Sequence, residues 1–418
     1  MCSDDPVLTN WSGNHTYAAA RMHRPTTVDQ LQQLVAEADR VRALGTRHAF
    51  TDLADTDGDL VSTADLPGTV EIDEDAATVR VAGGVRYGQL ADELSRRGWA
   101  LANLASLPHI SVAGAVATGT HGSGDRNGSL STAVRGIEQV DADGSVREVG
   151  RGDPDFDGSV VALGLLGVVT HLTLDLEPTY DVRQDLWTGL AWDDALANFD
   201  ALTGSAYSVS LFTDWTSDAI TQVWLKSRSD LAREELWGAQ AATETLHMLA
   251  GAPVDAVTVQ GGVAGPWHQR LPHFRMEFTP SRGEELQTEY FVRRDRAPEA
   301  IERLRRLGPA FAHLLQVGEI RTLAADRLWL SGAHGGETVG LHFTWHRDIA
   351  GVRSALDAVE EALLPLGARP HWGKCFLANA DRLRPLYPRF DDFRTLAGRC
   401  DPTGKFHNAW SQRHLDLG

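Results

Sequence analysis

The chain has 418 residues, of which 42% are hydrophobic and 23% charged, so it can form two domains with a large core and is not a disordered or fibrous protein. Its formal net charge of −18 disfavours nucleic acid as a partner, because an acidic surface repels phosphate groups. Its three cysteines, Cys2, Cys375 and Cys400, form no CxxC pair, which excludes a disulfide scaffold and a zinc ribbon.

The first residues, "MCSDDPVLTNWSG", are acidic and lack the basic segment and apolar core of a secretion signal. An apolar run of 18 residues occurs nowhere in the sequence. We therefore expect a cytoplasmic protein with no membrane partner.

The first hundred residues alternate between helical and strand patterns. In residues 27–43, apolar side chains recur at helical spacing behind a threonine cap, which predicts an amphipathic helix. The segment "RVRALG" (40–45) reads as a short strand that leads into a loop with a single histidine, His48. Period-two stretches in residues 68–84 predict strands, and residues 85–98 predict a helix that ends at Gly98.

Residues 113–128 are small and rich in glycine. Glycines with neighbouring hydroxyls can form a backbone cradle for an anion such as pyrophosphate, although tight turns that require glycine explain the same composition. Neither GxGxxG after a first strand nor GxxxxGK[ST] is present, which disfavours a Rossmann fingerprint and a nucleotide triphosphatase. Strands are expected in residues 137–149 and 167–178.

Pro178 marks an expected boundary. Beyond it, alternating stretches predict a large antiparallel sheet, at residues 206–215, 221–227, 286–293, 316–323 and 338–346. Helical patterns near 295–307 and 350–364 are expected to cover one face of it.

Alternation places Glu319 and Arg321 on one strand face, and His342 and Thr344 on one face of another strand. An ion pair on an exposed strand is the simpler interpretation of the first pair. A metal pair of His342 and His346 is disfavoured, because the segment alternates as a strand. If the two strands share a sheet, their polar face suits a polyhydroxylated substrate, whose buried hydroxyls each need a partner.

Seven motifs stand out in chain order: "NWSGN" (10–14), "LGTRHAF" (44–50), "ASLPHISVAGAVATGTHGSG" (105–124), "GVVT" (167–170), "EIR" (319–321), "HFTW" (342–345) and "RPHWGK" (369–374). Taken together, they closely resemble the alditol oxidases, which are flavoproteins of the vanillyl-alcohol oxidase type related to the aldonolactone oxidoreductases.

The resemblance implies an α+β fold of two domains: an FAD-binding domain in residues 1–180 and a cap domain with a large antiparallel sheet in residues 181–370. A C-terminal segment, residues 371–418, is then expected to contribute Lys374 to the flavin site. A monomer is expected.

The resemblance also implies the residues of the site. Those expected to contact FAD are Leu44, Gly45, Thr46, Arg47, His48, Ala49, Ser106, Ser111, Gly114, Thr118, Gly119, Gly122, Val168, Val169 and Lys374, with His48 bonded covalently to the flavin 8α-methyl group. Arg47 and Ala49 depart from the usual Gly-Ser/Thr-Gly-His-Ser loop, where a glycine and a serine stand. Ser106 is not a cysteine, so a second flavin bond is not available there.

The reaction that the resemblance implies is FAD-dependent oxidation of the terminal alcohol of an alditol, such as xylitol or sorbitol, to the aldose, with O2 reduced to H2O2. Ser106, Glu319, Arg321 and Lys374 are expected to bind the substrate, with His342 and Thr344 completing the catalytic set and no metal involved. The proton acceptor is open between His342 and Lys374. The alternative is an aldonolactone-type flavin dehydrogenase or oxidase that uses another electron acceptor.

Overall fold

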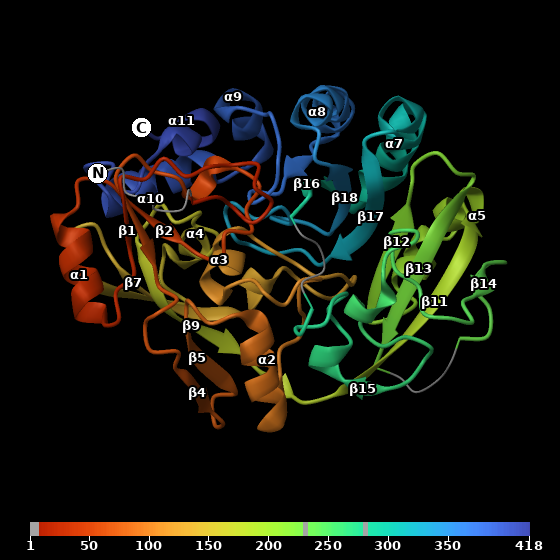
Figure 1. The fold of residues 1–418 in the computed structure, drawn as a ribbon, viewed down its shortest axis with the longest axis horizontal. Coiled ribbons are helices and arrows are strands. Elements are labelled where there is room, and N and C mark those ends of the chain that lie inside the picture. The colour runs from red at the N-terminus through yellow and green to blue at the C-terminus, as the bar shows by residue number, and fades with distance from the viewer. Residues whose placement is uncertain (1–7, 229–232, 279–282) are drawn as a thin grey trace, which may run out of the picture.

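The computed structural model describes residues 8–228, 233–278 and 283–418. The acidic first residues and Cys2 lie outside this range, and Cys375 and Cys400 are free thiols. In Figure 1 the N-terminal strands and α1 lie on one side of the molecule, and the strands β11 to β13 lie on the other. No helix in the described ranges is both long enough and apolar enough to cross a membrane.

A small parallel sheet begins the chain. Its strands are, in spatial order, β1 (Arg21–His23), β3 (Asp59–Ser62) and β2 (Val41–Leu44). Helix α1 (Val28–Glu37) begins where the Thr27 side chain accepts a hydrogen bond from the Gln30 N–H, as the threonine cap predicts. Its buried residues Leu31 and Val35 pack with Val41 of β2. The helix ends before residue 43 because residues 41–44 pair with β3 instead.

A five-stranded antiparallel sheet follows, next to a two-stranded ribbon. The five strands are, in spatial order, β4 (Val70–Asp73), β5 (Thr78–Ala82), β9 (Val168–Asp175), β7 (Val134–Val140) and β8 (Val146–Gly150). The ribbon pairs β6 (Trp99–Ala100) with β10 (Glu177–Pro178). The helices of this part are α2 (Tyr87–Arg96), α3 (Val112–Ala117) and α4 (Phe156–Ser159). The glycine-rich segment therefore contains a short helix.

A nine-stranded sheet forms the second half, as the alternating stretches predict. Its strands are, in spatial order, β14 (Gln240–Ala241), β11 (Asp181–Ala191), β13 (Ala219–Ser227), β12 (Ser208–Thr213), β17 (Leu315–Leu323), β18 (Thr338–His346), β16 (Glu285–Arg293) and β19 (Arg369–Pro370), with β15 (Gly265–Pro266) paired to β11. All of these pairings are antiparallel.

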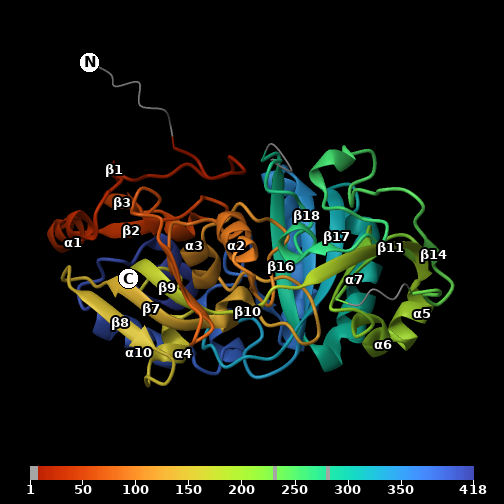
Figure 2. The ribbon, with the colours of Figure 1, turned by 90° about the horizontal axis from the view of Figure 1, so that it is seen from below.

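Helices cover one face of this sheet and leave the other face toward the N-terminal half (Figure 2). They are α5 (Trp192–Ala197), α6 (Phe199–Thr203), α7 (Ala297–Phe311) and α8 (Ile349–Leu363). Phe311 of α7 packs against Phe343 and Trp345 of β18. Alternation then directs His342 and Thr344 to the opposite face.

The C-terminal helices return to the N-terminal half (Figure 1). They are α9 (Ala380–Leu383), α10 (Phe390–Cys400) and α11 (Ala409–Leu415). The Val41 N–H donates to the Lys405 carbonyl at 2.9 Å, and the Asn408 amide donates to three carbonyls of residues 52–55. We propose the division into residues 1–180, 181–370 and 371–418, because the chain leaves the two-stranded ribbon at Pro178 and returns after β19.

Short 3₁₀ helices connect these elements, namely η1 (Asp52–Ala54), η2 (Leu130–Ala133), η3 (Val254–Ala256), η4 (Trp267–Gln269), η5 (Arg294–Arg296), η6 (Leu364–Leu366) and η7 (Arg384–Leu386).

Candidate active site

A cavity extends from the loop after β2 to the helix-free face of the nine-stranded sheet. The expected site residues that line it are Leu44, Gly45, Thr46, Arg47, His48, Ala49, Ser106, Ser111, Gly114, Thr118, Val169, Glu319, Arg321, His342, Thr344 and Lys374. The fold thus brings together groups that are more than 300 residues apart in the sequence.

Three expected cofactor residues do not lie among the described residues that line the cavity: Gly119, Gly122 and Val168. Val168 is buried in a separate apolar cluster with residues of α1. A Cβ at Gly122 would lie 2.3 Å from the Leu104 carbonyl oxygen, so close packing of the chain accounts for this glycine. The peptide segments that hold them do border the cavity, through Thr118, Thr120, His121 and Val169.

The loop after β2 packs against the start of α3. A Cβ at Gly45 or at Gly114 would lie 2.8 Å from the Ser111 hydroxyl, so both glycines allow this close approach. The Thr46 hydroxyl accepts a hydrogen bond from the Ser111 N–H at 3.3 Å. The positive end of a helix beside a glycine loop favours an anion. Apolar residues such as Leu163 and Leu172 line the same cavity and suit a ring system, so the residues present fit FAD.

His48 lies in this loop with its ring held on two sides. Its ring stacks on Trp11 with the centroids 5.4 Å apart, and its Nδ1 lies 3.0 Å from the Thr46 hydroxyl. Burial lowers the pKa of His48 to about 4, with further lowering by the nearby His109 and Arg86. The imidazole is therefore neutral at pH 7, which leaves a nitrogen lone pair available for bond formation.

Arg47 has a left-handed backbone conformation, with φ +64°. Glycine adopts this region without a steric penalty, whereas a residue with a Cβ does not. The Arg47 guanidinium donates to the Thr9 carbonyl at 3.0 Å, and the Arg47 carbonyl accepts from the Trp11 N–H at 2.8 Å. Arg47 therefore occupies a backbone position that favours glycine, and it ties the N-terminal segment to the loop.

Three polar residues form a row across the sheet. His342 of β18 pairs with Glu319 of β17 on one side and with Glu289 of β16 on the other. Next to this row, Arg321 pairs with Gly340, where a Cβ would lie 3.0 Å from the Glu289 carboxylate. Both Glu319 and Arg321 are 5% exposed, so the interpretation as an exposed ion pair is wrong.

Glu289 is the buried anion of the site. Its carboxylate lies 2.8 Å from Arg321 Nη2, 2.9 Å from Lys374 Nζ and 3.1 Å from His121 Nε2. Burial alone would raise the pKa of Glu289, but Lys374, Arg321 and His121 hold it well below its usual value. The carboxylate is therefore ionised and balances the two cations.

Lys374 and His342 are in direct contact, with Lys374 Nζ 2.7 Å from His342 Nδ1. His342 Nε2 lies 3.1 Å from the Thr344 hydroxyl. Burial and the charge of Lys374 lower the pKa of His342 to about 4, so the imidazole is neutral. Burial also lowers the pKa of Lys374, against the opposing effect of Glu289.

Ser106 and Glu319 complete the polar face. Arg321 Nη1 donates to the Ser106 hydroxyl at 3.2 Å, and Arg321 Nε lies 3.5 Å from Glu319 Oε2. Although burial raises the pKa of Glu319, Arg321 and His273 lower it below its usual value. This face thus offers an ionised carboxylate, a guanidinium, an ammonium and hydroxyls to one ligand.

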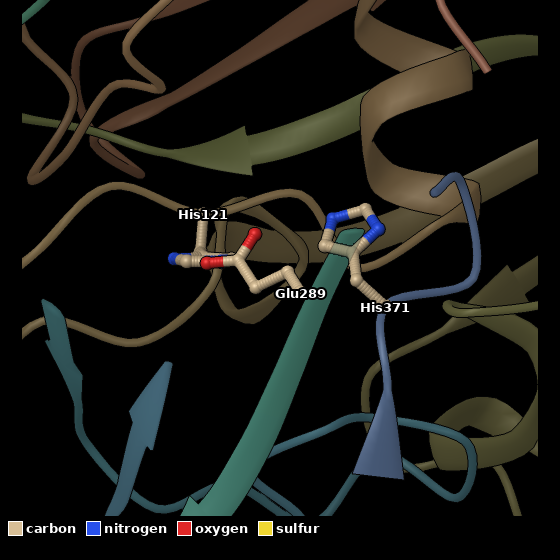
Figure 3. Close-up of side chains that lie close together, drawn as sticks. All are labelled: His121, Glu289 and His371. Carbon is tan, nitrogen blue, oxygen red and sulfur yellow. The ribbon is translucent and has the colours of Figure 1, made fainter. Parts of the chain in front are cut away.

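His121, Glu289 and His371 each place a possible metal-ligating atom within 4.8 Å of the others (Figure 3). The three side chains come from the segment after α3, from β16 and from the segment after β19. The charge of the carboxylate is already matched by Arg321 and Lys374, and a divalent ion beside two buried cations is strongly disfavoured. We interpret the group as part of the ionic cluster.

The sequence analysis missed Glu289, His121, His371 and Arg42, all of which line the cavity. Glu289 alternates with buried apolar residues in residues 286–293, so the argument used for Glu319 could have found it. Arg42 lies in β2 and donates to the carbonyls of Leu53, Leu163, Gly164 and Phe406. No local pattern marks such a contact.

Two protein-family models match the chain, one in each half. A family model described as "FAD binding domain" matches residues 19–150, and one described as "D-arabinono-1,4-lactone oxidase" matches residues 279–414. The chain is 48% identical to an alditol oxidase from a Streptomyces species, over 98% of this chain and 99% of that protein. It is 29% identical to L-gulono-1,4-lactone dehydrogenase from Mycobacterium tuberculosis, over 98% and 99% of the two chains.

The fold is similar to solved structures of cholesterol oxidase. The enzyme from Brevibacterium sterolicum superposes with a TM-score of 0.78 at 15% identity and covers 98% of this chain and 96% of its own. The expected two-domain fold of the vanillyl-alcohol oxidase type is thus confirmed. With near full-length identity of 48% to a known member, the chain belongs to the alditol oxidase family of FAD-dependent oxidoreductases.

Proposed function

We propose that this enzyme oxidises the terminal primary alcohol of an alditol, such as xylitol or sorbitol, to the aldose, and that O2 is reduced to H2O2. The observation that supports this is the polar face of the sheet, where Glu319, Arg321 and Lys374 line the same cavity as the loop of His48. Each hydroxyl of a polyol needs a partner once it is buried, and this face supplies both donors and acceptors.

Substrate binding is assigned to Ser106, Glu319, Arg321 and Lys374. Glu319 accepts from a substrate hydroxyl, while Arg321 and Lys374 donate to substrate oxygens. The Arg321 contact with Ser106 fixes the spacing of these groups. His342 and Thr344 border the same cavity beside Lys374.

FAD is assigned to the cavity between the loop of residues 44–50, the start of α3 and the sheet. Of the expected contacts, Leu44 to Ala49, Ser106, Ser111, Gly114, Thr118, Val169 and Lys374 border it directly. We assign the covalent 8α bond to His48, because its neutral ring is held at the cavity wall. Held by these residues, FAD would supply the hydride acceptor that oxidation of the substrate carbon requires.

The proton leaves the substrate hydroxyl toward Lys374 and His342. Lys374 Nζ donates to His342 Nδ1 at 2.7 Å, so these groups can pass a proton between them. His342 is neutral at pH 7 and takes up the proton at Nδ1 by way of Lys374 Nζ. The positive charge of Arg321 stabilises negative charge at the substrate oxygen.

The second candidate is an aldonolactone-type flavin dehydrogenase or oxidase that passes electrons to another acceptor. The 29% identity to an L-gulono-1,4-lactone dehydrogenase and the match of residues 279–414 to the arabinonolactone oxidase model support it.

An anaerobic titration of the purified protein tests both candidates. Xylitol or sorbitol should bleach the flavin absorption band, and admission of air should restore it with one H2O2 per turnover. Bleaching by alditols without peroxide would favour another electron acceptor. Bleaching by L-gulono-1,4-lactone but by no alditol would support the second candidate and contradict the first.

We also propose that the enzyme acts as a monomer in the cytoplasm, without a nucleic-acid or membrane partner. The formal charge of −18 supports the part of this proposal that concerns nucleic acid, because an acidic surface repels phosphate groups.

A further inference from the structure

Another buried cation, Lys226, lies on β13, two strands away from β17 and on the same face of the sheet as Arg321. Its side chain is 1% exposed, and its ammonium donates to the carbonyls of Leu271 and Pro272 at 2.6 and 3.0 Å. The third contact of the ammonium is His273 Nδ1, at 3.1 Å. A buried charge is costly unless it is fully hydrogen-bonded, so this arrangement needs a reason.

The contact with Lys226 defines where His273 has its proton. An ammonium only donates, so His273 Nδ1 accepts and the ring proton is on Nε2. His273 Nε2 lies 2.8 Å from Glu319 Oε1, and so donates to it. Burial first, and the charge of Lys226 second, lower the pKa of His273 to about 4. A neutral His273 thus orients Glu319 without neutralising it.

The segment that contains His273 also holds Ser106, another of the proposed substrate-binding residues. The N–H groups of His273 and Phe274 both donate to the Ser106 carbonyl, at 3.1 and 3.2 Å. Residues 271–274 therefore fix the Ser106 backbone and the Glu319 side chain together, and Lys226 holds this segment through three of its acceptors.

We propose that Lys226 is a positioning residue for substrate binding, which acts through His273 to orient the Glu319 carboxylate. The inference rests on the proposed role of Glu319 as a ligand of a substrate hydroxyl. Lys226 does not border the cavity among the described lining residues, so its effect on the substrate is indirect.

The arrangement makes substrate affinity depend on pH. Burial lowers the pKa of Lys226 to about 7, while Glu319 raises it and Arg321 lowers it further. The other titratable group that faces it is His273, and its strand neighbours are the uncharged Gln184 and Ser208. A neutral amine has only two hydrogens for three acceptors, so the segment loosens above about pH 7.

Lys226→Met tests the proposal, since methionine keeps the length of the side chain and removes every donor. We expect KM for xylitol to rise about tenfold at pH 6.5, as the loss of a hydrogen bond to a charged group predicts, with kcat changed less than about threefold. The parent KM should increase between about pH 7 and 9, and this increase should be absent in the variant.

Lys405→Met is a matched control. Lys405 is also buried and donates to three carbonyls, those of Val35, Ala36 and Ala142, but it does not line the cavity. It should lower the melting temperature and leave KM and its pH profile unchanged. If both variants change KM alike, the effect is a general loss of stability and the proposal is wrong.

Two further variants keep the test decisive. Glu319→Gln tests the role of Glu319 separately from that of Lys226. An unchanged KM in Glu319→Gln contradicts the proposed role of Glu319 in substrate binding. A raised KM in Glu319→Gln, together with a normal KM in Lys226→Met, overturns only the present inference about Lys226. If Lys226→Met does not fold with its flavin, Lys226→Arg replaces it. A permanent cation should remove the alkaline rise in KM, and its persistence would exclude Lys226 as its origin.

Discussion

The carboxylate of Glu289 lies 2.9 Å from the ammonium of Lys374 and also contacts Arg321, so one buried anion holds both cations of the site. Glu289 reaches them from the middle of β16, where its side chain is fully buried. The positions of Lys374 and Arg321 are therefore coupled through a residue that we do not assign to substrate binding.

Glu289→Gln should reduce kcat/KM for xylitol by roughly a hundredfold or more, because both cations lose their counter-charge. The free energy of unfolding should fall by about 3–5 kcal/mol, as when one partner of a buried pair is removed. The pKa of Lys374 should also fall, since Glu289 raises it, so an alkaline limb of activity should move to lower pH. Steady-state kinetics across pH and urea unfolding measure these effects.

Glu360→Gln is the matched control for this prediction. Glu360 is equally buried and accepts from the Tyr290 hydroxyl and the Leu377 and Ala378 N–H groups, away from the cavity. It should lose stability and keep its turnover per bound flavin. Equal losses of activity in the two variants would show that Glu289 acts only on stability.

The sequence predicts those parts of the fold that depend on local periodicity. Strand alternation placed His342 and Thr344 on one face, and the structure shows Phe343 and Trp345 packed on α7 from the other. The threonine cap of α1 was likewise predictable, because the cap and the helix are neighbours in the chain.

The rest of the site depends on strand register, which no local pattern specifies. Glu289 meets His342 only because β16 and β18 pair at that position, and Lys226 meets His273 although the two are 47 residues apart in the sequence. The resemblance to the alditol oxidases did not predict the contact of Glu289 with His342 or that of Lys226 with His273 either. The backbone of Arg47 could not be predicted either. Its left-handed conformation favours glycine, but the residue has a side chain, so only the φ angle in the structure reveals the strain.

Arg47 can be tested with Arg47→Gly and Arg47→Val, which both lose the contact with Thr9. The backbone at φ +64° costs a residue with a Cβ about 1–2 kcal/mol, and a β-branched residue most. We expect the free energy of unfolding of Arg47→Gly to lie within about 1 kcal/mol of that of the parent. Glycine relieves the backbone strain, but it loses more conformational entropy on folding, so the two effects largely cancel. Arg47→Val should be less stable than Arg47→Gly by about 1–2 kcal/mol in urea unfolding. Equal stability of the two variants would contradict the strained conformation.

Asp326 predicts a pH dependence of stability. Burial raises the pKa of its carboxyl to about 6, although the Ser331 hydroxyl and the Leu328 N–H both donate to it. The folded protein then binds more protons than the unfolded chain between about pH 4 and 6, so this group lowers stability as the pH rises through that window.

Asp326→Asn should therefore be more stable than the parent at pH 8, by roughly 1–3 kcal/mol, and the difference should shrink toward pH 4. The amide oxygen can still accept from the Leu328 N–H, and its nitrogen can donate to Ser331. Urea unfolding at both pH values measures the difference. A difference that does not change with pH would show that the carboxyl is already ionised throughout.

His48 is the proposed covalent anchor of FAD, and acid precipitation tests it, because only a covalent bond retains the cofactor in an unfolded chain. The parent pellet should stay yellow, whereas His48→Ala should release its flavin into the supernatant. His109→Ala is the control: His109 is half-buried, is not among the described residues that line the cavity, and its Nε2 donates to the Met276 carbonyl at 2.9 Å. It should keep the flavin in the pellet.

The covalent bond and the affinity for FAD are separable in this variant. His48→Ala retains Thr46, Ser111 and the glycines that form the cavity wall, so under native conditions it should still bind added FAD. Gel filtration followed by absorption spectroscopy measures that binding. A yellow pellet from His48→Ala would exclude His48 as the attachment site. A variant that binds no FAD even natively would instead show that the ring of His48, stacked on Trp11, is needed to form the cavity.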